Sequence, residues 1–129
     1  MELFQIILIF LVSRKIVNII FILFAILSLL AIFYHLRGIF WPNEITPAWR
    51  HVLFISINGI CIYGFLKRPE WFIWFVGLLT LQQWYSHGSY AIELWQEKHV
   101  IHWISVGIIV LMPVAFVLLL LERRKGFIV

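Results

Sequence analysis

Five histidines are spread along this 129-residue chain, and the spacing of their polar neighbours suggests a binding site. His51 and Asn58 are seven residues apart, and Gln83 and His87 are four apart, so each pair would share one face of a helix. Imidazoles and amides can orient a small ligand through a few well-placed hydrogen bonds. We therefore predict a ligand-binding set that also includes two sequence neighbours: His51, Asn58, Gln83, His87, Trp84 and Arg50.

A second pattern could bind a metal ion. His99 and His102 are three residues apart, which would place two imidazoles on one helical face, and two carboxylates lie just upstream. Imidazole nitrogens and carboxylate oxygens are common zinc ligands. The candidate metal ligands are His99, His102, Glu93 and Glu97. This spacing allows chelation but lacks the specificity of a His-Glu-x-x-His motif.

Two other interpretations remain open at the level of the sequence. His51 and His87, on different helices, could ligate haem b, which would make the chain a haem- or quinone-linked redox subunit. Alternatively, the polar groups only tie helices together, and the chain is a structural subunit or a small homo-oligomeric channel. Gly59 and Gly64 would allow the close helix approach that such a channel needs.

The elements that must position these side chains follow from an unusually apolar composition. Hydrophobic residues make up 64% of the chain and charged residues 12%, against averages of about 45–50% and about 25%. A chain this short could not hide so much apolar surface in a water-soluble fold. The net charge of +4 does not indicate a nucleic-acid partner, because no basic patch is interleaved with aromatic residues. Cys61 is the only cysteine, so no intrachain disulfide can form.

Four apolar segments have the length of about 20 residues that a membrane-spanning helix needs. Only helices satisfy their own backbone groups in lipid outside a closed barrel. We expect an all-α integral membrane protein, a four-transmembrane-helix bundle forming a single domain over residues 1–129. The expected spans are 16–35, 48–66, 70–88 and 100–121. A loop is expected over 88–100, and Pro113 should kink the last span.

The two ends of the chain lie outside these spans. Residues 2–12 are apolar but too short to span, so we expect an amphipathic segment at the membrane surface, with residues 122–129 as a cytoplasmic tail. The segment lacks the basic start and cleavage site of a signal peptide. Seven of the ten Lys and Arg residues fall on one side of the four-span arrangement, which places both termini in the cytoplasm. The expected location is a bacterial inner membrane.

This topology puts all five histidines at the non-cytoplasmic end of the helices. We therefore expect an outward-facing pocket that binds a small ligand or ion, in a transport or binding role. No phosphate-binding loop or hydrolase nucleophile motif is present, which favours a protein that is not an enzyme. The expected partners are the lipid bilayer, the small ligand or ion, and further copies of the chain or a larger membrane complex.

Overall fold

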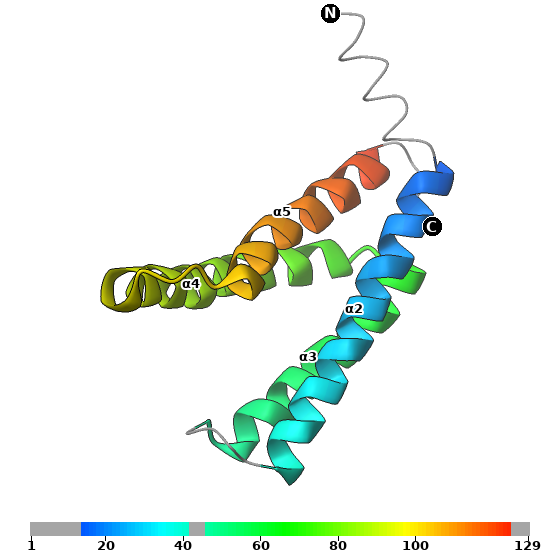
Figure 1. Cartoon of the computed structure of the whole chain (residues 1–129). Coiled ribbons are helices and arrows are strands. Elements are labelled where there is room, and N and C mark those ends of the chain that lie inside the picture. Colours follow the sequence, from blue (N-terminus) through cyan, green and yellow to red (C-terminus); the bar gives the residue numbers. More distant parts are fainter. Residues whose placement is uncertain (1–13, 42–45, 125–129) are drawn as a thin grey trace, which may run out of the picture. The chain divides into compact units, whose positions relative to one another are not determined.

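The computed structural model describes residues 14–41 and 46–124, and these are almost entirely α-helical (Figure 1). The four helices are α2 (Arg14–Phe40), α3 (Ala48–Lys67), α4 (Phe72–Lys98) and α5 (Trp103–Arg124). The all-α prediction is therefore confirmed for this part of the chain. The predicted surface segment 2–12 lies outside the described residues, as do residues 125–129 of the predicted tail.

Three of the described helices, α2, α3 and α5, are long and apolar enough to cross a membrane. Helix α4 is as long as α2 but is not among them, because from Gln82 onward it carries three glutamines, two glutamates and a lysine. Large apolar side chains along the three helices are exposed in the isolated chain, as expected of surfaces that contact lipid. This composition indicates a membrane location.

The helices form two compact units, which we describe separately as the first hairpin (α2 and α3) and the second hairpin (α4 and α5). In the first hairpin, buried positions on α2 recur every three or four residues, at Val17, Phe21, Phe24 and Ser28. This spacing places them in one stripe against α3. Phe65 of α3 stacks on two of them, with ring centroids 5.9 Å from Phe21 and 5.2 Å from Phe24.

Helix α3 ends where the sequence provides a stop signal. Arg68 adopts a left-handed conformation, with φ of 51°, and its backbone N–H donates to the Gly64 carbonyl at 2.7 Å. Pro69 follows, and proline cannot continue the hydrogen-bonding pattern of a helix.

The second hairpin is also antiparallel, and its facing residues are in register. A side chain at Gly77 would lie 3.1 Å from the Phe116 ring, and the Thr80 hydroxyl lies 3.4 Å from the Met112 carbonyl. Val76 on α4 and Leu119 on α5 are buried. Continuing this register along both helices brings His87 to the level of the first turn of α5.

The loop predicted over 88–100 is wrong for most of its length, because α4 continues to Lys98. The end of the apolar segment shows where the chain would leave the lipid. A helix can continue beyond that point into water. Residues 91–98 contain strong helix formers and no proline, so nothing stops the helix there. It ends at His99, which adopts a left-handed conformation with φ of 53° and donates its backbone N–H to the Trp95 carbonyl at 3.0 Å.

Candidate functional site: two imidazole clusters

The first hairpin brings two histidines into direct contact near the turn between its helices. The Nδ1 atoms of His35 on α2 and His51 on α3 lie 3.1 Å apart, and the ring centroids are 5.4 Å apart. For this contact to be a hydrogen bond, one ring must carry its proton on Nδ1 and the other must present a bare nitrogen. The two Nδ1 atoms therefore face the same small region, one as donor and the other as acceptor.

Neighbouring residues fix both rings of this pair. The Phe54 ring stacks on the His35 ring at 5.1 Å with an interplanar angle of 11°. His51 is only 4% exposed, and a Cβ atom at Gly38 would lie 2.5 Å from its Cε1 atom. Glycine at position 38 thus lets the His51 ring lie directly against the α2 backbone. We refer to His35 and His51, held by Gly38 and Phe54, as the direct pair.

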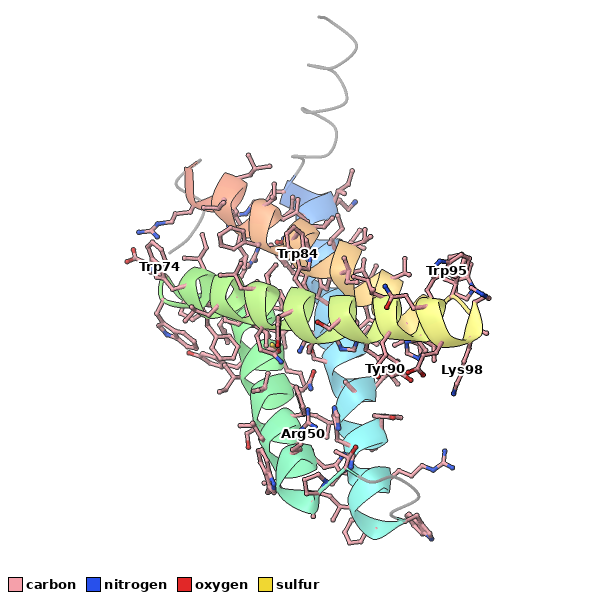
Figure 2. All side chains as sticks on the ribbon, turned by 90° about the vertical axis from the view of Figure 1, so that its left-hand side faces the viewer. Arg50, Trp74, Trp84, Tyr90, Trp95 and Lys98 are labelled. Carbon is pink, nitrogen blue, oxygen red and sulfur yellow. The ribbon has the colours of Figure 1, made fainter. Side chains whose placement is uncertain are left out.

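Asn58 lies on the same hairpin but makes its described hydrogen bond within its own helix. Its side-chain amide donates to the Phe54 carbonyl at 2.8 Å, and Ser28 on α2 similarly donates to the Phe24 carbonyl at 3.0 Å. These bonds use polar groups that would otherwise be costly in an apolar environment. Arg50, labelled in Figure 2, has an exposed side chain.

In the second hairpin a serine stands between two histidines. Ser105 Oγ lies 3.0 Å from His87 Nδ1 and 2.8 Å from His102 Nδ1, and Ser105 is 0% exposed. The hydroxyl has a single proton, and His102 Nδ1 must be an acceptor because it also receives the backbone N–H of Ser105, so one arrangement satisfies all contacts. His87 donates Nδ1–H to the serine oxygen, and the serine donates O–H to His102 Nδ1. We refer to these three residues as the bridged pair.

His102 also forms the N-cap of α5. Its Nδ1 accepts the backbone N–H of Ser105 at 3.3 Å, and its carbonyl accepts the N–H of Val106 at 3.1 Å. A side-chain acceptor at this position satisfies a backbone donor that has no partner within the helix. The Tyr90 and His102 rings meet in a T-shaped arrangement, with 5.1 Å between their centroids. Helix capping alone therefore gives His102 a structural role.

Trp84 lies on α4 beside α5 (Figure 2), where its indole has a structural partner. Its Nε1–H donates to the Ile109 carbonyl at 2.7 Å. Pro113 has no N–H, so it cannot supply the helical bond that this carbonyl would receive from a residue four positions later. The indole of α4 thus satisfies the carbonyl that the proline in α5 leaves without its helical donor.

The remaining candidates lie near the middle of α4, toward its end, or just beyond it. Gln83 is half-buried, whereas Glu93, Glu97 and His99 are exposed, with His99 contacting Trp95 edge to face at 5.8 Å. Trp95 and Lys98 mark this end of the helix in Figure 2. Among the described residues no three potential metal ligands come together, and this includes the four predicted from the sequence.

The structure therefore distributes the predicted ligand-binding residues over two hairpins. It pairs His51 with His35 and His87 with His102, and the predicted pocket that would combine the two hairpins stays a prediction. Gly38 and Ser105 were missed by sequence reasoning. A signal for each was present, because each lies three residues after a histidine and would share its helical face.

No family model matches the chain, and no curated protein or solved structure matches it either. The class of protein rests on the fold and the site alone. The described chain is an all-helical protein with membrane-length helices and one imidazole cluster near the turn of each hairpin.

Proposed function

We propose that this chain is a four-span membrane protein that binds a small ligand or ion at the non-cytoplasmic ends of its helices. The membrane would be a bacterial inner membrane, and both termini would lie in the cytoplasm. The observation that carries the proposal is the pairing of imidazoles near the turn of each hairpin, at 3.1 Å in the direct pair and through Ser105 in the bridged pair.

Helix α4 serves as the fourth span in this proposal, although its composition is less apolar than that of the other helices. Its 27 residues correspond to about 40 Å at ~1.5 Å per residue, which exceeds a hydrocarbon core of about 30 Å. The polar final turns of α4 would then stand outside the lipid. Within the span, Thr80 and Trp84 direct their donors to backbone carbonyls, which reduces the cost of placing them there.

Paired imidazoles near the ends of membrane helices support a binding role because ionisable groups are costly near lipid and tend to mark functional sites. Asn58, Gln83 and Arg50 would supply further polar contacts, with Trp84 forming part of the wall.

A structural role is the second candidate, and the bridged pair favours it. Its hydroxyl and two Nδ1 atoms satisfy one another, and Ser105 is fully buried. In that case the second hairpin would use its histidines to hold α4 against α5. The haem or quinone alternative needs His51 and His87 to meet, and the channel alternative needs a second copy at Gly59 and Gly64, so both remain predictions.

The test is to compare what the purified wild-type protein carries with what a quadruple variant carries. The variant combines His51→Ala, His87→Ala, His99→Ala and His102→Ala. Elemental mass spectrometry, an ultraviolet–visible spectrum and mass spectrometry of an organic extract would be recorded on the same samples. A stoichiometric species present in wild type and absent from a folded variant supports the proposal, and equal contents in the two proteins contradict it.

Membrane topology needs an independent test. With Cys61 replaced by serine, a single cysteine at Gly88 should react with a membrane-impermeant maleimide from the outside of intact cells. A single cysteine at Glu70 should react only after the membrane is opened. The opposite pattern would contradict the orientation on which the outward-facing site depends.

A further inference from the structure

Building on the proposed function, we infer that the direct pair is a chelating site for a divalent transition-metal ion. The two ligands would be the Nδ1 atoms of His35 and His51. This inference narrows the small ligand or ion to metals that favour imidazole, such as zinc, copper, nickel and iron. It also places the metal in the first hairpin, away from the residues for which the sequence predicted it.

The distance between the two nitrogens suits a shared metal. Zn–N bonds of about 2.0–2.1 Å at a tetrahedral angle place two ligand nitrogens about 3.3 Å apart. The two Nδ1 atoms lie 3.1 Å apart, so their separation needs to change little for one ion to bind both. The same separation without a metal is that of a hydrogen bond, in which one of the two nitrogens carries a proton.

Metal binding needs no net loss of protons from two neutral rings. The imidazole that carries its proton on Nδ1 must carry it on Nε2 instead, which frees both Nδ1 lone pairs. Ring nitrogens must be unprotonated to bind a metal, so binding should weaken in acid. Arg37 and Arg50 are the nearest cations in the sequence, and their exposed side chains are screened by solvent.

The surroundings hold the two rings in place before a metal arrives. Phe54 fixes the plane of the His35 ring, and the α2 backbone at Gly38 supports the His51 ring. Fixed ligand orientation lowers the entropic cost of binding. Two protein ligands leave further coordination positions for water or another ligand.

The bridged pair of the second hairpin is not an equivalent site. Ser105 Oγ occupies the space between His87 and His102 that a metal would need. His102 Nδ1 also accepts the backbone N–H that begins α5, so metal binding there would cost a helix cap. The contrast makes the first hairpin the specific location of the proposed site.

The experiment uses Co²⁺ as a spectroscopic probe of the full-length protein in detergent or lipid nanodiscs. We expect one Co²⁺ per chain, with the visible absorption of a nitrogen-ligated ion, and displacement by Zn²⁺. His35→Gln and His51→Gln should abolish binding, whereas Glu70→Gln, which removes an exposed carboxylate outside the first hairpin, should leave it unchanged. Gly38→Ala keeps both ligands but should weaken binding about tenfold, because it displaces the His51 ring.

A replacement ligand guards against variants that simply fail to fold. His35→Cys should restore binding and add a thiolate-to-cobalt charge-transfer band. The inference is overturned if folded wild type binds no Co²⁺, if His35→Gln binds it as tightly as wild type, or if His35→Cys shows no such band. If wild type carries an organic molecule that the quadruple variant lacks, yet binds no Co²⁺, only this inference fails and the proposed function stands.

Discussion

In the first hairpin two imidazoles meet each other directly, whereas in the second a serine hydroxyl lies between them. Both arrangements join a pair of antiparallel helices near their turn, and both bury one member almost completely, His51 in one case and Ser105 in the other. In the bridged pair one set of donors and acceptors can satisfy all three contacting atoms at once. The direct pair instead points two nitrogens at each other, and their contact is a hydrogen bond when one of them carries a proton.

This difference shows how the same residue type can have distinct roles in one chain. In the bridged pair, where the Ser105 hydroxyl completes the hydrogen bonding, the histidines hold two helices together and one of them caps a helix. Where two imidazoles face each other through their Nδ1 atoms, moving one proton from Nδ1 to Nε2 would turn the pair into the proposed chelate. Three changes can break or sharpen this comparison, and they are described in order of decreasing effect.

The largest effect is expected for Gly38→Ala. The new Cβ atom would lie 2.5 Å from the His51 ring, and the clash involves a ring with little room to move. We expect a loss of about 3 kcal/mol in the free energy of unfolding, at the upper end of the cost of overpacking. Thermal or denaturant unfolding in detergent would measure it.

Gly59→Ala is the matched control for this change. Gly59 is helical, belongs to the same hairpin, and a side chain there would meet nothing within 4 Å. The substitution should be neutral or stabilising by up to about 1 kcal/mol, the difference in helix propensity. Equal destabilisation by the two variants would refute the special role of Gly38.

An intermediate effect is expected for Ser105→Ala. The variant leaves His87 without an acceptor and removes the hydroxyl donor to His102 in a fully buried position. We expect a loss of about 2 kcal/mol, within the range for a buried polar group that loses its partner. Ser89→Ala, on the exposed surface of α4, should change stability by less than about 0.5 kcal/mol. If both variants unfold alike, the bridged pair does not tie the second hairpin.

The smallest effect is expected for Trp84→Phe, which removes the donor to the Ile109 carbonyl. Its cost should be about 1 kcal/mol, as for other hydrogen bonds between membrane helices. In a Pro113→Ala background the backbone N–H at position 113 can take over, so the same change should cost less. A double-mutant cycle measures this coupling. Trp74→Phe, where the side chain is 70% exposed, is the control, and a coupling of zero would contradict the proposed link between the indole and the proline.

The number of helices in the described chain follows from the sequence, because each apolar segment of membrane length became one helix. The ends of the helices were harder to predict, because hydropathy indicates whether a segment prefers lipid or water and not where its backbone hydrogen bonding stops. Helix α4 therefore continues about ten residues past the predicted span, until the left-handed backbone at His99 ends it. The end of α3 was predictable, because Pro69 directly follows Arg68, the left-handed residue at which the helix ends.

The candidate site was predictable only in its residue types. Helical spacing predicts which polar residues share a face, but the identity of the facing residue depends on the register of two helices. That register is set by apolar contacts such as Phe65 against Phe21 and Phe24, far from the histidines in sequence. The pairing of His51 with His35, and the insertion of Ser105 between two imidazoles, therefore could not be derived from periodicity alone.

The indole of Trp84 has a mechanical consequence for α5. Pro113 removes one backbone hydrogen bond from the middle of that helix, and a helix ordinarily bends more easily at such a position. Here the Ile109 carbonyl accepts a hydrogen bond from the Trp84 indole of the neighbouring helix instead. The rigidity of α5 at Pro113 therefore depends on α4. If α4 slid along its axis by a fraction of a turn, this hydrogen bond would break and α5 could bend at its midpoint.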